Sequence, residues 1–198
     1  FEQAGASLTF FADEQTQRDL GFFVVPASFF QSLNSSFVVG FAPLLAWLWV
    51  KLGKHNPSSP TKMAMGLFLL AMGYLWIAFG VKDVQPGIKV SMIWLLGMYA
   101  MHTLGELCLS PIGLSLVNKL APLKFSSLLM AVWFTANAFA NYLAGALSKL
   151  YPEAGKSKQV FGFSIENNFD FFLMFVIMAG TASLILFILS RKLQSLMK

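Results

Sequence analysis

Five long apolar stretches constrain this chain more than any other feature of its sequence. They cover approximately residues 24–50, 63–81, 90–117, 126–150 and 171–189, and a shorter one covers 1–12. A membrane-spanning helix needs roughly 20 mostly apolar residues, so each long stretch is predicted to cross a bilayer. Only 12% of the residues are charged, against about 25% in soluble domains. The sequence therefore predicts an all-α integral membrane fold and excludes a water-soluble one.

The six segments are predicted to form a single bundle over 1–198. Residues 1–12 look like the second part of a truncated helix, and we expect the chain to be a fragment of a longer polypeptide. The connections contain proline and glycine, which do not continue helices. Alternate connections hold eight basic residues and no acid: Lys51, Lys54, Lys62, Lys119, Lys124, Arg191, Lys192 and Lys198. Because basic residues favour the cytoplasmic side, these loops and the C-terminus are predicted to be cytoplasmic.

Only two of the nine acidic residues fall inside the apolar helices, namely Glu2 and Glu106. A carboxylate near the bilayer centre costs on the order of 2.5–3.5 kcal/mol. Such a group is expected to face a partner or a water-filled cavity, and acids in these positions often serve proton or substrate pathways. A buried acid with a purely structural hydrogen bond is the alternative for Glu106.

Other polar side chains are expected near the same depth. His102 and Ser110 lie four residues either side of Glu106, so the three share one helix face. Asn34 has polar neighbours that suggest a wet cavity, and Trp133 lies about two turns into its helix. Interhelical hydrogen bonding remains open for Asn34, and simple packing for Trp133. A polar, partly acidic cavity at mid-membrane depth is typical of transporters.

Other classes of function fit less well. His102 and Ser110 form the only conceivable nucleophile and base pair, and they are about 12 Å apart along a helix by its rise, so an enzyme is not expected. The two histidines and single cysteine, Cys108, form no metal-ligand pattern. The net charge of +5 is spread over loops rather than gathered into a nucleic-acid surface. A channel or a structural membrane subunit remains an alternative.

Several segments together resemble the proton-coupled oligopeptide transporters, a branch of the major facilitator superfamily. They are FEQAGASLT (1–9), FQSLN (30–34), GELCLSPIGLS (105–115), and WFTANA (133–138) followed by NYLAG (141–145). The resemblance spans the chain and implies the C-terminal half, helices seven to twelve, of a twelve-helix bacterial transporter. It implies symport of di- and tripeptides across the inner (plasma) membrane, driven by a proton gradient without a cofactor. The implied partners are the peptide, the N-terminal six-helix half and the lipid bilayer.

The resemblance also implies roles for individual residues. Glu106 would face the amino terminus of the peptide and take part in proton coupling, Asn34 would contact its backbone or amine, and Trp133 would line a side-chain pocket. Glu2 would couple protonation to gating by pairing with a basic residue of the N-terminal half. Weaker candidates for the cavity wall are Gln3 and Ser110. A related carrier for another small solute is the nearest alternative.

Overall fold

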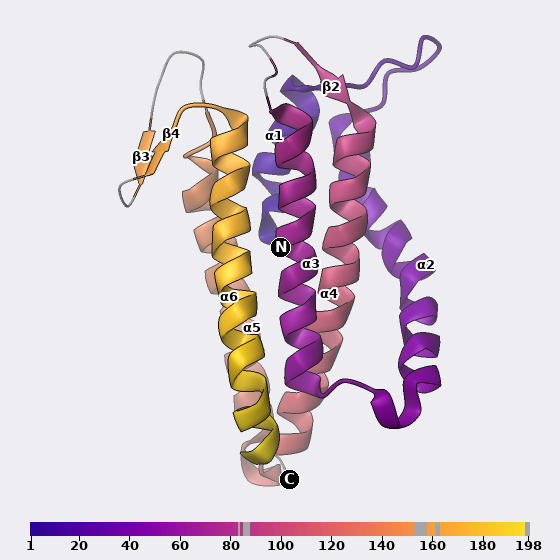
Figure 1. Ribbon diagram of the computed structural model, residues 1–198, viewed down its shortest axis with the longest axis vertical. Helices are drawn as coiled ribbons and strands as arrows, with labels where there is room; N and C mark the ends of the chain where they lie inside the picture. The colour runs from indigo at the N-terminus through magenta and orange to yellow at the C-terminus, as the bar shows by residue number, and fades with distance from the viewer. Residues whose placement is uncertain (83, 85–87, 153–157, 161–162, 197–198) are drawn as a thin grey trace.

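The computed structural model is built almost entirely from helices (Figure 1). It describes residues 1–82, 84, 88–152, 158–160 and 163–196. The helices are η1 (Glu2–Gly5), α1 (Ser7–Glu14), α2 (Ala27–Leu52), α3 (Ser59–Val81), α4 (Met92–Leu120), α5 (Ser126–Ser148) and α6 (Asn168–Leu196), with single 3-10 turns at η2 (Gly53–His55) and η3 (Leu123–Phe125). Among the described residues, five helices are long and apolar enough to cross a bilayer. The predicted all-α membrane fold is therefore confirmed.

The first predicted segment, 1–12, is not one continuous helix. The short 3-10 turn η1 ends at Gly5, and the backbone of Ala6 then takes a non-helical conformation, with φ −125° and ψ −103°. Helix α1 begins at the next residue and continues to Glu14, two residues beyond the predicted end. Because of this break, Glu2 lies on a turn that is separate from α1.

The long helices differ from their predicted ranges mainly at their ends. Helix α2 begins at Ala27 rather than at 24, because Pro26 has an extended backbone, with ψ 142°. Helix α3 begins four residues early because the Ser58 hydroxyl accepts a hydrogen bond from the amide of Thr61, which is a favourable N-cap. Helix α6 extends beyond the predicted 171–189 at both ends, since polar residues that lower the hydropathy still form helix. Helix α4 is shifted from 90–117 to Met92–Leu120, and α5 ends at Ser148 rather than at 150.

Glycine residues let α3 pack closely against α4. Figure 1 shows α3 between α4 and α6, with α2 beyond α4 and α5 behind. Gly66, Gly73 and Gly80 lie seven residues apart along α3 and receive Gly105, the Met98 side chain and the Trp94 ring of α4, respectively. Small residues at helix contacts allow such backbone approach in membranes, where packing rather than the hydrophobic effect drives association. This contact fixes the position of α4, which carries Glu106.

An aromatic core joins α1, α3 and α6. Phe11 of α1 meets Phe172 of α6 edge to face, with ring centroids 5.3 Å apart. Tyr74 of α3 stacks on Phe175 of α6 at 4.9 Å. Phe11, Tyr74 and Phe172 are each almost completely buried. The core therefore holds α1, and the η1 turn before it, against the central helices.

Short strands, which the hydropathy pattern does not reveal, lie near one end of the bundle (Figure 1). Strand β1 (Thr16–Gln17) pairs in parallel with β2 (Val90–Ser91), connecting the end of α1 to the start of α4. Strands β3 (Lys158–Val160) and β4 (Phe163–Ile165) form an antiparallel pair in the connection before α6, whose sequence predicts a loop.

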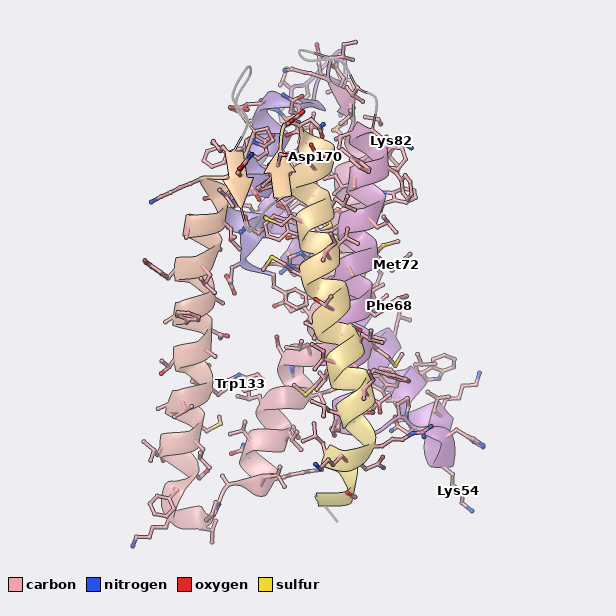
Figure 2. The ribbon with its side chains drawn as sticks, turned by 60° about the vertical axis from the view of Figure 1, so that its left-hand side comes forward. Lys54, Phe68, Met72, Lys82, Trp133 and Asp170 are labelled. Carbon is pink, nitrogen blue, oxygen red and sulfur yellow. The ribbon has the colours of Figure 1, made fainter. Side chains whose placement is uncertain are left out.

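The acid-free basic connections lie at the other end of the bundle. The α2–α3 and α4–α5 connections and the end of α6 share this end (Figure 1). Figure 2 shows Lys54 at one end of the bundle and Lys82 and Asp170 at the other. Lys51 and Lys62 each place their ammonium groups over a tryptophan ring of α2, at 4.6 and 4.4 Å from the centroids. Lys198 lies outside the described residues.

Candidate functional site

A polar cavity of about 390 Å³ lies where η1, α2, α4 and α5 meet. Its wall includes Glu2 from η1, Asn34 from α2, His102 and Glu106 from α4, and Asn141 from α5. The two acids singled out by the charge distribution therefore line the same cavity, although they are 104 positions apart in the sequence. Among the described residues, no lysine or arginine lines this cavity.

Glu106 is held in the cavity wall by Asn34. The amide Nδ2 of Asn34 donates a hydrogen bond to Oε2 of Glu106, at 3.1 Å. The bond joins α2 to α4 and satisfies part of the hydrogen-bonding capacity of the carboxylate. A carboxylate has about four acceptor positions, so Glu106 can still receive donors from a bound molecule.

Thr103 supports this pair, although it is not among the site residues predicted from the sequence. Its hydroxyl Oγ1 lies 2.5 Å from Oδ1 of Asn34 and 2.8 Å from the carbonyl oxygen of Tyr99. Thr103 is completely buried, one helical turn before Glu106. The signal in the sequence was its spacing of three from Glu106, which places both residues on neighbouring parts of one helix face.

The backbone beside Glu106 is fixed by the closest contact between α3 and α4. A Cβ atom built on Gly105 would lie 2.6 Å from the carbonyl oxygen of Gly66, and one on Gly66 would lie equally close to the carbonyl oxygen of Gly105. Neither backbone can accommodate a larger residue without moving. The side of α4 next to Glu106 is therefore locked against α3, while the carboxylate faces the cavity.

His102 occupies the cavity wall one turn before Glu106, as the spacing of four predicts. Its side chain is 2% exposed, and its ring meets Phe1 edge to face at 4.9 Å. The Nδ1 atom is buried without a hydrogen-bond partner among the described residues. Ser110, which shares the predicted face, does not line this cavity.

Glu2 and Gln3 are adjacent but take different positions. Glu2 lines the cavity. Gln3 is not part of the wall of this cavity, because its amide donates to the carbonyl oxygen of Ala144 at 3.1 Å and accepts from the Ser7 hydroxyl at 2.6 Å. Successive residues of a 3-10 turn point about 120° apart, which explains why neighbours in η1 diverge. Gln3 thus connects η1 to α5.

Trp133 lies between α5 and α4 outside this cavity (Figure 2). A Cβ atom on Gly113 would lie 2.2 Å from the end of the Trp133 ring, so the ring packs directly on the α4 backbone. The structure does not bring Trp133 together with Glu106 and Asn34. In the described residues, no three His, Cys, Asp or Glu side chains group as a metal site would require.

Comparison with known proteins identifies a matching family model and several similar sequences. The sequence model of the POT family matches residues 1–164. An uncharacterized transporter of Bacillus subtilis (strain 168), YclF, is 42% identical over 152 residues, covering 77% of this chain and 31% of that protein. The peptide transporter YePEPT of Yersinia enterocolitica is 38% identical over 151 residues, covering 74% of this chain and 30% of that protein.

A solved structure matches the whole arrangement of helices. It is the crystal structure of a mutant of the peptide transporter POT in complex with alafosfalin, with a TM-score of 0.84 and 36% sequence identity. The match covers 96% of this chain and 37% of the solved one, so the chain spans about a third of the length of its relatives. Together, the family match and the shared helix arrangement confirm the predicted family: this chain belongs to the POT family of transporters.

Proposed function

We propose that this chain forms one six-helix half of a transporter that carries di- and tripeptides across the inner (plasma) membrane together with protons. The main support is the Glu106 carboxylate, held by Asn34 in the wall of a polar cavity inside the bundle. The name of the Yersinia relative, a peptide transporter, supports the substrate class. The proton gradient supplies the driving force, and no cofactor is required.

The chemistry of a peptide explains why an acid is needed here. A free peptide carries an ammonium group at one end and a carboxylate at the other. Glu106 can accept charge-assisted hydrogen bonds from the ammonium group, and these are about twice as strong as bonds between neutral groups. An acid at this position therefore favours a peptide substrate over an anionic solute such as nitrate.

The second half of the site is expected to come from another part of the transporter. Since no basic side chain among the described residues lines the cavity, the peptide carboxylate would be bound by the N-terminal six-helix half. The two halves would rock about the central site to give alternating access. The basic connections at one end of the bundle support a cytoplasmic C-terminus.

Uptake by the full-length transporter in liposomes tests the proposal. Labelled dipeptide is expected to accumulate only when a proton gradient is imposed. Glu106→Gln should abolish this accumulation, because it removes the charge that binds the ammonium group. Glu166→Gln is the matched control, since it makes the same change at an exposed residue of the connection before α6. Full accumulation by Glu106→Gln would overturn the proposal.

A further inference from the structure

The hydroxyl of Thr103 lies within hydrogen-bond distance of two oxygen atoms but carries one hydrogen. One is the carbonyl oxygen of Tyr99, at 2.8 Å, which can only accept. The other is Oδ1 of the Asn34 side-chain amide, at 2.5 Å. An amide has an accepting oxygen and a donating nitrogen of nearly the same size. The Thr103 hydrogen can therefore point either way, depending on which end of the amide faces it.

When Glu106 is ionised, one arrangement of hydrogen bonds pairs Glu106, Asn34 and Thr103 with one another. The Nδ2 atom of Asn34 donates to the carboxylate, as the structure shows, and Thr103 donates to Oδ1 of the same amide. In this state the charge on Glu106 is available to hold an ammonium group in the cavity.

When Glu106 takes up a proton from cavity water, the protonated Oε2 becomes a donor and needs an acceptor. Rotation of the Asn34 amide by half a turn brings Oδ1 to Glu106 and Nδ2 to Thr103. Thr103 then accepts from Nδ2 and turns its own hydrogen to the carbonyl oxygen of Tyr99. The three hydrogens that take part, on Oε2, Nδ2 and the Thr103 hydroxyl, each have an acceptor, and the only net change is the added proton on Glu106.

We propose that Thr103, Asn34 and Glu106 form a hydrogen-bond switch in which proton uptake by Glu106 reverses the Asn34 amide and redirects the Thr103 hydroxyl. Thr103 is then a positioning residue that acts through Asn34. The switch rests on the proposed function for its link to transport: the protonation state of Glu106 would set how strongly the cavity holds the ammonium group of the peptide. A ligand or proton shifts such a two-state element only by its differential affinity for the two states.

The elements packed around Glu106 place few charged or titratable groups beside it. Glu2 on η1 and His102 on α4 face the same cavity. The α2 and α5 side chains in its wall, Asn34 and Asn141, carry no charge. On α3 the uncharged backbone of Gly66 packs against Gly105, the neighbour of Glu106. These groups stay the same when Thr103 is changed, so a Thr103 variant isolates the switch.

Infrared titration of the full-length transporter in lipid tests the switch without measuring transport. The carboxylic acid band of Glu106 is identified as the band that Glu106→Gln removes. The protonated arrangement uses two hydrogen bonds of the Thr103 hydroxyl and the ionised arrangement uses one. Thr103→Val, which keeps the shape, should therefore lower the pH midpoint of the band by about 0.7 units, the equivalent of one hydrogen bond of about 1 kcal/mol.

Thr103→Ser, which keeps the hydroxyl, should leave the midpoint at its native value. In an Asn34→Ala background, Thr103→Val should cause no further shift, because Thr103 acts only through the amide. If Thr103→Val does not fold, Thr103→Ala removes the same hydroxyl and carries the same prediction. An unshifted midpoint in the variant that lacks the hydroxyl, an equal shift in Thr103→Ser, or a shift that persists without Asn34 would overturn the switch. Lack of proton-driven uptake by the native transporter would instead count against the proposed function alone.

Discussion

Gly105→Ala tests whether the backbone contact between α3 and α4 positions Glu106. The added Cβ atom would lie 2.6 Å from the carbonyl oxygen of Gly66, whereas ordinary contacts begin at 3.4 Å. One helix must therefore retreat by about 0.8 Å, since both atoms belong to or adjoin helix backbone and no flexible side chain can yield. Overpacking of this kind costs about 1–3 kcal/mol, partly offset by up to about 1 kcal/mol of better helix propensity.

The assay is thermal unfolding of the purified transporter, followed by dipeptide affinity at a temperature where the variant is folded. Gly180→Ala on α6 is the matched control, because a Cβ atom there meets nothing within 4 Å. Gly105→Ala should unfold at lower temperature than Gly180→Ala and bind dipeptide more weakly, since Glu106 is the next residue. Equal unfolding temperatures for the two variants would refute the inference that this contact is tight.

Two further predictions concern the neighbouring acid and amide of η1. Glu2→Gln should reduce gradient-driven uptake more than counterflow exchange, because exchange needs no net proton movement; equal loss in both assays would indicate structural damage instead. Gln3→Leu should lower the free energy of unfolding by about 1–3 kcal/mol, since it removes the bond to Ala144 and leaves the Ser7 hydroxyl without its acceptor. The dipeptide affinity of Gln3→Leu should stay close to native. A loss of affinity without a loss of stability would indicate that Gln3 contacts the peptide after all.

The helices were predictable from sequence because crossing a bilayer requires a long apolar run. The ends of the helices were less predictable, because a hydropathy average falls where polar residues begin even if the helix continues. Ser58 caps α3 before its apolar run, and residues 190–196 continue α6 as helix beyond its own. The strands β1 to β4 are two or three residues long, too short to show a pattern. Their pairing depends on contacts between distant parts of the chain.

The cavity was partly predictable for a related reason. Because a charged side chain is costly inside a membrane, the sequence alone marks Glu2 and Glu106 as candidate functional residues. The structure brings both to one cavity with Asn34. Thr103 could not be identified in this way, since a threonine can bond to the carbonyl of its own helix and so costs little in an apolar segment. Gln3 does not line this cavity, because the 3-10 geometry of η1 turns it away from Glu2.

Binding of a dipeptide and of its N-acetylated form tests whether Glu106 recognises the amino terminus of a peptide. The two ligands differ in the ammonium group, and a hydrogen bond to a charged group is worth about 1.5–3 kcal/mol. The native transporter should therefore prefer the free dipeptide by roughly 10- to 150-fold. In Glu106→Gln this preference should fall close to one, whereas in Glu166→Gln it should persist. An undiminished preference in Glu106→Gln would show that Glu106 does not bind the ammonium group of the peptide.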